Sequence, residues 1–443
     1  MTTPHVPGSR PTKSRLPKSG GNKEPRFFYG WWIVAVMAVG TSASMAMGSL
    51  NFGLFIVPMG EELNIGRSTF GWSQSVRQLA SAVTSPIIGP LLDKFGARIL
   101  LPAAALIVGA AMIGLSFIDS GWQLILLFAA MGLVGMGGPG ALVTSVPVVK
   151  WFRRKRARAI AFASLGIPIG ALVFVPLTQV FIDAWGWRNA WIALAVLGVG
   201  IIVPPALIFL RRQPEDIGLL PDGDTPDSDS DDGSNGAPDE ISWTTREAVR
   251  SVVFWKLVVV FTGVALALGT IGVHRIPAFV DRGVDPGQIA IATAFDAVAA
   301  GISTFVMGNL AHRIPGRVLG ALGFTFLAVS SALTIYADTF ALVFISMAIF
   351  GLGIGGMMFL QNFIWAEYFG RAHLGAIRGV VMPITLIVGG IGAPAAGYVY
   401  DITGSYDGIW WVGVGIMSAA AILEITVNAP VHPSQRLEQP WVS

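Results

Sequence analysis

Long apolar stretches that carry almost no charge recur along the whole of this chain. Of its 443 residues, 53% are hydrophobic and 12% are charged, roughly half the charged fraction of a soluble domain. A membrane-spanning helix needs about 20 apolar residues, so a dozen such helices fit within this length. The composition excludes a soluble enzyme, a nucleic-acid-binding protein and a secreted module. The sequence has no cysteine, which also excludes disulfides and thiolate metal sites.

The apolar runs, separated by short charged segments, predict an all-α membrane protein with twelve transmembrane helices. We expect these helices near residues 30–58, 70–92, 99–118, 122–149, 157–182, 188–210, 257–280, 287–310, 318–336, 340–366, 376–400 and 408–428. Residues 1–29 are polar and basic and lack the apolar stretch of a signal peptide. We expect them to form a disordered cytoplasmic tail, and residues 429–443 to form a second cytoplasmic tail.

The distribution of basic residues predicts the orientation of the helices. If both termini are cytoplasmic, all but five of the 29 lysines and arginines lie on the cytoplasmic side. Arg67, Arg188 and Arg282 then fall outside, and Arg77 and Arg275 fall within helices. An excess of basic residues in cytoplasmic loops is the rule for membrane proteins. We expect a monomeric, multi-pass protein of the plasma (inner) membrane with both termini in the cytoplasm.

One long connection divides the chain into two halves. Residues 211–256 hold 11 of the 26 acidic residues amid glycine, serine and proline, a composition that cannot bury enough apolar surface to fold. We interpret this acidic linker as a cytoplasmic tether between six-helix bundles at residues 30–210 and 257–428. Binding of a regulator is the alternative. Near its end, Thr244 and Glu247 have the pattern of a capping box, which predicts a short interfacial helix.

The two halves of the sequence resemble each other. Segment 89–98, Gly-Pro-Leu-Leu-Asp-Lys-Phe-Gly-Ala-Arg, aligns with segment 308–317 at a shift of 219. The Gly-Met-Gly-Gly segment 135–138 aligns with Gly-Ile-Gly-Gly at 353–356 at a shift of 218. Nearly constant shifts indicate two homologous bundles in parallel orientation. Secondary transporters are built in this way and hold their substrate between the halves, near the middle of the membrane.

Segment 89–98 resembles the loop signature of the major facilitator superfamily, which joins the second and third helices. Ala97 departs from that signature. The matching positions, which the resemblance assigns to a gate, are Gly89, Asp93, Lys94, Gly96 and Arg98. Segments 28–32, 151–157, 186–188 and 400–406 resemble the branch of monocarboxylate porters and oxalate/formate antiporters. The resemblance implies the major facilitator fold, with twelve helices in two pseudo-symmetric six-helix bundles, and transport by alternating access.

Charged residues within the predicted helices are the first candidates for function, because charge inside a membrane is costly. Arg77 lies in the second helix and Asp296 in the eighth, at positions related by the shift of 219. One face of the second helix adds polar residues that suit a water-filled cavity: Ser73, Gln74, Ser81 and Thr84. We interpret Arg77 as a substrate-binding residue. The alternative is an arginine that extends along its own stem to the membrane surface.

Asp296 is the main candidate for proton coupling. A carboxylate at that depth must pair with a cation or take up a proton, so the alternative role is a permanent structural ion pair. Monocarboxylate porters carry an arginine one turn after such an aspartate, whereas this chain has Ala300 there. Arg275 lies at a similar depth in the seventh helix. It can replace that partner and offers a planar fork to an organic anion. His274 is a second proton-coupling candidate, or a plain hydrogen-bonding residue.

Neutral polar residues complete the candidate site. Asn51, Gln361 and Asn362 are candidates for substrate binding, with hydrogen bonding between helices as the alternative. No metal-binding cluster, HExxH, GxSxG or P-loop pattern occurs in the sequence. We therefore expect no catalysis, no metal, no cofactor and no nucleic-acid partner.

These features together favour a secondary active transporter of a small organic anion, specifically a monocarboxylate. Its partners would be that anion, protons and the lipid bilayer, and its driving force would be proton coupling or anion exchange. A transporter of a neutral or drug-like solute is the first alternative, although segment 166–170, Gly-Ile-Pro-Ile-Gly, matches the drug-antiporter signature poorly. A transport-inactive membrane sensor on the same fold is the second alternative.

The gate that the resemblance places at Asp93 gives a first prediction. The Asp93 carboxylate is expected to meet the positive N-terminal end of the eleventh helix, near residues 375–378, where it would contribute about 0.3–2 kcal/mol to closure of the cytoplasmic side. Asp93→Asn should therefore lower the turnover rate while protein level and substrate affinity stay nearly unchanged. Uptake and binding measured on the same preparation check this, and an unchanged turnover rate removes Asp93 from the gate.

Overall fold

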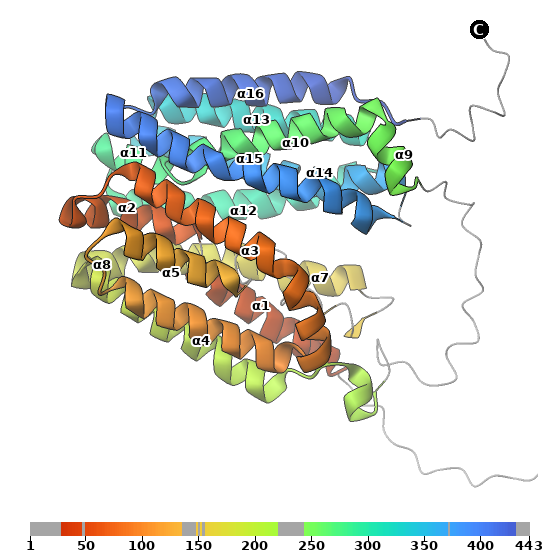
Figure 1. Cartoon of the computed structure of the whole chain (residues 1–443), viewed down its shortest axis with the longest axis horizontal. Coiled ribbons are helices and arrows are strands. Elements are labelled where there is room, and N and C mark those ends of the chain that lie inside the picture. The colour runs from red at the N-terminus through yellow and green to blue at the C-terminus, as the bar shows by residue number, and fades with distance from the viewer. Residues whose placement is uncertain are drawn as a thin grey trace, which may run out of the picture.

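The chain forms a bundle of long helices (Figure 1), and the computed structural model describes residues 28–46, 49–134, 148, 151–152, 156–219, 243–370 and 373–430. Its α-helices are α1 (Gly30–Ala46), α2 (Ser49–Leu63), α3 (Arg67–Phe95), α4 (Ala97–Leu115), α5 (Gly121–Leu133), α7 (Arg156–Ser164), α8 (Gly166–Phe209), α9 (Thr245–Arg250), α10 (Val252–Gly272), α11 (Arg275–Asp281), α12 (Pro286–Leu310), α13 (Gly316–Tyr336), α14 (Phe340–Phe369), α15 (Leu374–Thr403) and α16 (Asp407–Ile425). A short 3₁₀ helix spans Pro214–Ile217. Within the described ranges the fold is all-α, as predicted.

Each predicted transmembrane helix has a counterpart among these elements. α1 and α2 together form the first, and α10 and α11 together form the seventh. The 44 residues of α8 contain most of the fifth and nearly all of the sixth. The backbone breaks between these two at Gly186, where φ is 77°. Glycine adopts this left-handed conformation without steric cost. The fourth predicted helix corresponds to α5, and its part beyond residue 134 falls mainly outside the described residues.

Nine helices in the described part of the chain are long and apolar enough to cross a membrane. α3 is 29 residues long but is not among the nine, because its serines, glutamines and Arg77 lower its mean hydropathy. α5 is not among them because its described part is 13 residues long, which is too short to cross a membrane. The polar character of α3 is the feature that made it a candidate for lining a cavity.

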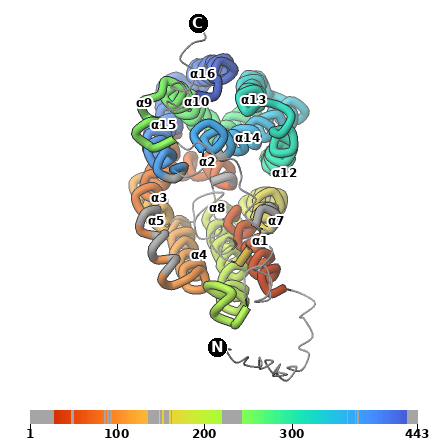
Figure 2. The backbone as a smooth tube through the Cα atoms, turned by 90° about the vertical axis from the view of Figure 1, so that its right-hand side faces the viewer, coloured from red at the N-terminus to blue at the C-terminus, as the bar shows by residue number. Residues whose placement is uncertain are grey.

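The helices pack as two bundles, one from each half of the chain. Figure 2 shows the red-to-yellow helices of the first half below the green-to-blue helices of the second. One cluster of buried apolar side chains comes from residues 33–210, and another comes from residues 243–427. A third cluster joins the bundles, where Val175 of α8 packs with apolar residues of α11 and α12, among them Phe279 and Ala290.

Close helix contacts repeat at equivalent positions in the two bundles. A Cβ atom added to Gly132 of α5 would collide with the carbonyl oxygen of Arg77, and one added to Gly351 of α14 would collide with that of Asp296. The shift of 219 relates both the glycines and the residues that they contact. Residues without a side chain permit such close packing of helices. Arg77 and Asp296 therefore occupy equivalent positions, as the sequence repeat predicts.

The acidic linker is described at its two ends, and residues 220–242 fall outside the described ranges. At its second end, the backbone N–H of Glu247 donates to Thr244 Oγ1 at 3.3 Å. The backbone N–H of Thr244 donates to the Glu247 carboxylate at 2.9 Å. The predicted capping box is thus present and begins α9.

The bundles meet at one end of the molecule, which we call the loop end. It holds the connections 64–66, 282–285 and 404–406, at the left of Figure 1, whereas the opposite, terminal end holds Gly30 and Ile425. α3 and α15 lie side by side near the loop end, where Ser75 donates a hydrogen bond to the carbonyl of Gly390. Towards the terminal end the two helices separate (Figure 1).

Four residues, Arg67, Asp281, Tyr400 and Asp401, join the bundles at this end, and we call them the loop-end latch. Asp401 of α15 accepts hydrogen bonds from the first backbone N–H groups of α3, those of Arg67 at 2.8 Å and Ser68 at 3.1 Å. The Arg67 guanidinium lies 2.9 Å from Asp281, whose second oxygen accepts a hydrogen bond from the Tyr400 hydroxyl at 2.9 Å. A carboxylate at a helix N-terminus is favourably placed, so Asp401 stabilises closure of this end.

Replacing Asp401 should therefore favour opening of the loop end. Asp401→Asn removes the charge that faces the α3 N-terminus, worth about 1 kcal/mol or about fivefold in the opening equilibrium. Because the chain has no cysteine, spin labels on cysteines placed at Asp119 and Asp338 report the distance across this end. Asp407→Asn is the matched control, since Asp407 approaches Arg282 of its own bundle at 3.9 Å. Equal distance distributions in both variants would contradict the role given to Asp401.

Candidate functional site

A buried ion pair lies in the second bundle, between α11 and α12. Arg275 begins α11, just after α10 ends at Gly272. Its Nη2 atom forms an ion pair with Oδ2 of Asp296 in α12. Each residue is only 5% exposed, so both charges are almost fully removed from solvent. Arg275 was predicted as a partner of Asp296, and the structure places the two together.

The Arg275 guanidinium has further capacity to bind an anion. The Phe350 ring of α14 covers one face, with its centroid 4.2 Å from Arg275 Cζ. Among the described residues, neither Nε nor Nη1 of Arg275 has a hydrogen-bond partner. A buried donor without an acceptor is costly, so these two nitrogen atoms are suited to an acceptor that arrives from outside the protein.

Arg77 occupies the equivalent position in the first bundle but has different surroundings. It is 5% exposed, and its guanidinium lies 5.9 Å from the Phe128 ring centroid. Ser73 and Gln74, from the polar stripe predicted beside it, are buried, while Ser81 and Thr84 are half-buried. The stripe is thus enclosed towards the loop end and accessible towards the terminal end.

His274 has both ring nitrogen atoms in hydrogen bonds. Nε2 lies 2.8 Å from the carbonyl oxygen of Ala393 in α15, and Nδ1 lies 3.3 Å from the Tyr406 hydroxyl. Because a carbonyl only accepts, Nε2 carries the proton, and Nδ1 of the neutral ring accepts from Tyr406. His274 is fully buried. Its geometry fits the hydrogen-bonding role that the sequence analysis kept as the alternative to proton coupling.

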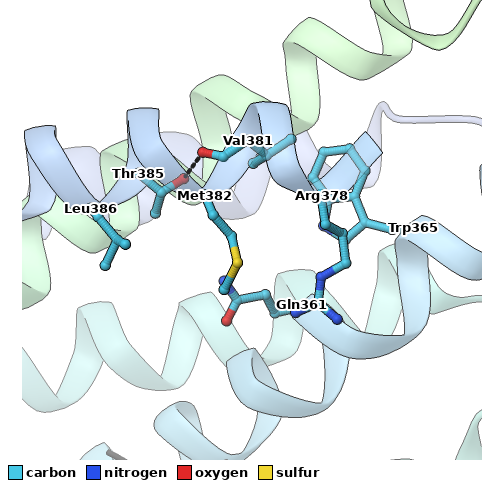
Figure 3. Close-up of a pocket in the computed structure, with 7 residues that line it drawn as sticks. All are labelled: Gln361, Trp365, Arg378, Val381, Met382, Thr385 and Leu386. Carbon is cyan, nitrogen blue, oxygen red and sulfur yellow. Dashed lines mark hydrogen bonds between the residues drawn. The ribbon is translucent and has the colours of Figure 1, made fainter. Parts of the chain in front are cut away.

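The neutral candidates do not converge on one point. Asn51 Nδ2 donates to Thr178 Oγ1 at 2.8 Å, whereas its buried Oδ1 has no partner among the described residues. Gln361 of α14 lines a separate pocket with Arg378 of α15 (Figure 3). The side chain of Asn362 lies outside the described part of the structure.

The predicted gating motif is partly described. Gly96 has a positive φ of 73° before the start of α4, and Arg98 Nε donates to the carbonyl of Leu207 at 2.9 Å. Lys94 lies 5.3 Å from the Phe95 ring. Gly89 and Asp93 belong to α3, but the Asp93 side chain lies outside the described part of the structure. Its contact with the N-terminal end of α15, near residues 375–378, stays a prediction.

Glu424 of α16 was not among the candidates predicted from sequence. This residue is fully buried, and neither carboxylate oxygen has a hydrogen-bond partner among the described residues. The rule that singled out Arg77 and Asp296, charge within a predicted membrane helix, also applies to Glu424. It packs against Gly320 of α13. Within the described residues, no group of three or more His, Asp or Glu side chains could hold a metal.

Comparisons with known proteins agree with this architecture. The model of the family described as Major Facilitator Superfamily matches residues 36–281 and 276–443. Monocarboxylate transporter 13 of Bos taurus is 24% identical to this chain, over 92% of this chain and 93% of its own length. An uncharacterized MFS-type transporter of Escherichia coli, YhjX, is 24% identical over 79% of this chain and 83% of its own length.

A solved structure has the same fold. It is that of a bacterial homolog to the human lysosomal transporter Spinster, in an inward-facing and unoccupied conformation. Its TM-score is 0.62 at 13% identity, over 92% of this chain and 96% of that chain. The family match covers far more than half of the sequence. The chain therefore belongs to the Major Facilitator Superfamily, a family of multi-pass membrane transporters, and within it resembles the monocarboxylate transporters.

Proposed function

We propose that this protein is a secondary active transporter of a small organic anion, specifically a monocarboxylate. It acts as a monomer in the plasma (inner) membrane, with both termini cytoplasmic. The observation that carries the proposal is the buried Arg275 guanidinium, which lies between Asp296 and Phe350. Two of its nitrogen atoms have no acceptor among the residues that the structure describes. A planar guanidinium matches a carboxylate with two parallel hydrogen bonds.

The balance of charge in the inner helices supports an anion. Within α3, α11 and α12, Arg77, Arg275 and Asp296 are buried to the same degree, and these three side chains together carry a charge of +1 when Asp296 is ionised. One bound carboxylate would neutralise it. The relatives named monocarboxylate transporters, at 23–25% identity, support the same class of substrate. A neutral solute would leave the excess charge uncompensated.

Proton coupling follows from the shared partner. In the state described here, Asp296 is paired with Arg275. Protonation of Asp296 would release the guanidinium for the incoming carboxylate, so that proton and anion load together. Linkage then requires the anion to raise the proton affinity of the site by the same factor by which the proton raises anion affinity. Loading both leaves the net charge of these groups unchanged and keeps a carboxylate against Arg275, so closure avoids the desolvation cost of an unpaired buried cation.

The arginines provide a test of anion binding. Arg275→Gln removes a charge-assisted hydrogen bond worth about 1.5–3 kcal/mol, which lowers affinity about 10- to 150-fold. Arg77→Gln should weaken binding to a similar extent, and lysine at either position should restore it only in part because the planar fork is lost. Binding and proteoliposome uptake of labelled acetate, lactate and benzoate measure these effects.

Two controls distinguish the loss of a substrate-binding charge from a general loss of charge and from misfolding. Arg246→Gln removes an exposed arginine of α9, and the double variant Arg275→Gln/Asp296→Asn avoids leaving a buried carboxylate alone. If both single glutamine variants transport normally, charge does not hold the substrate and a neutral solute becomes the better proposal.

Asp296→Asn tests the coupling. Asparagine resembles the protonated carboxyl, so the variant should still bind the anion and exchange it across the membrane. It should lose accumulation driven by a pH gradient, because the site can no longer release a proton. Counterflow and gradient-driven uptake measured on the same proteoliposomes distinguish the two activities. Concentration of substrate by Asp296→Asn under a pH gradient would show that coupling lies elsewhere, and His274 would be tested next.

A further inference from the structure

A serine of α3 contacts the backbone of α15 where the two bundles meet. The Ser75 hydroxyl donates a hydrogen bond to the carbonyl of Gly390, and Ser75 is buried. One turn away the two backbones touch, because a Cβ atom added to Gly71 would lie 2.5 Å from the carbonyl oxygen of Ala393. Figure 1 shows α3 and α15 side by side. The hydrogen bond therefore joins the first bundle to the second at a point removed from solvent.

Pro394 leaves the carbonyl of Gly390 in need of this donor. In an α-helix each carbonyl accepts from the N–H four residues later, and within α15 that residue is Pro394. Proline has no N–H, so the carbonyl four residues before it loses its partner in the helix. Serine side chains of neighbouring helices can satisfy such a freed carbonyl inside a membrane. Ser75 supplies the donor that Pro394 cannot provide.

The Ser75 hydroxyl has a second acceptor in its own helix. Its oxygen lies 3.0 Å from the carbonyl oxygen of Gly71, and a hydroxyl has one proton to donate. When the bundles separate, Ser75 can turn this proton towards Gly71 and stay bonded. A buried donor left without an acceptor would be costly. Because Gly71 removes that cost, the contact with Gly390 can be broken and made again without leaving Ser75 unpaired.

α15 is also anchored to its own bundle at this place. His274 Nε2 donates to the carbonyl oxygen of Ala393 at 2.8 Å, and Ala393 directly precedes Pro394. This anchor holds the proline segment of α15 against the second bundle. Separation of the bundles should therefore break the hydrogen bond of Ser75 and leave the segment of α15 in place.

The other half of the repeat has an alanine in place of the serine. A shift of 219 relates Ser75 to Ala294 of α12. A shift of 218 relates Pro394 to Pro176 of α8. The proline is thus present in both halves, but an alanine side chain cannot donate a hydrogen bond. α8 and α12 instead meet through apolar residues, among them Val175. The interface of α3 with α15 therefore holds a polar contact that its counterpart cannot make.

We propose that Ser75 is a positioning residue that holds the loop end closed through the carbonyl freed by Pro394. Its hydroxyl turns to Gly71 when the bundles separate, so that the serine acts as a switch between two carbonyls. The switch acts on the conformational equilibrium, whichever solute is carried. It lies in the buried part of the contact between the bundles, whereas the loop-end latch lies in the exposed part.

Opening of the loop end measures this role in the full-length protein without any substrate. Spin labels on cysteines placed at Asp119 and Asp338 report the distance across that end. Ser75→Ala should raise the ratio of open to closed molecules about three- to tenfold, because the closed state loses one hydrogen bond. Ser303→Ala is the matched control. The buried Ser303 hydroxyl donates to the carbonyl of Leu352 in α14 at 2.6 Å, within one bundle, so its loss should leave the ratio as in wild type.

Pro394→Ala tests the origin of the free carbonyl. Alanine restores an N–H that the carbonyl of Gly390 can accept from within α15, so adding Ser75→Ala to this variant should have little further effect. An equal effect of Ser75→Ala with and without the proline would overturn the proposal. It is also overturned if Ser75→Ala leaves the distances unchanged, or if Ser303→Ala shifts them equally. Should Pro394→Ala fail to fold, the comparison of Ser75→Ala with Ser303→Ala decides.

Discussion

The ion pair between Arg275 and Asp296 organises the centre of the second bundle, because neither charge is tolerable there alone. Removing one partner of a buried pair costs about 3–5 kcal/mol. The pair joins α11 to α12, and Phe350 of α14 covers its cation. The neighbouring His274 bonds to Ala393 of α15. Three helices, α11, α12 and α14, thus meet at one guanidinium, and the residue before it ties α15 to the same region.

The transmembrane helices could be predicted from sequence because the membrane imposes a local rule on each segment. Apolar length and charged boundaries depend on neighbouring residues only, so even the break at Gly186 within α8 corresponds to a predicted gap between helices. The equivalence of Arg77 and Asp296 was also predictable, because a constant shift between repeats preserves helix packing. The contacts of Gly132 and Gly351 with these two residues show that the packing is conserved.

The partners of the candidate residues could not be predicted in the same way. Which side chains meet depends on the rotation and crossing of helices distant in sequence, and equivalent positions therefore differ: Arg77 lies over Phe128, whereas Asp296 pairs with Arg275. For the same reason, sequence did not predict that Gln361 lines a pocket with Arg378 of α15. Glu424 is a different kind of omission, because the rule about charge within membrane helices identifies it without any structure.

The loop-end latch and the central Arg275–Asp296 pair differ in burial. This difference fits the latch to conformational change and the central pair to ligand binding. The latch side chains Arg67 and Asp281 are 12% and 27% exposed, and ion pairs open to water contribute about 0–1 kcal/mol each. The central pair lies wholly within the second bundle, so a rigid-body movement of the bundles leaves it intact. A ligand shifts an equilibrium only by its differential affinity for the two conformations, about 1.4 kcal/mol for each factor of ten. A latch made of exposed contacts can be opened by a difference of that size. Opening a latch as strong as the buried pair would need a larger difference in binding free energy than one small anion can provide.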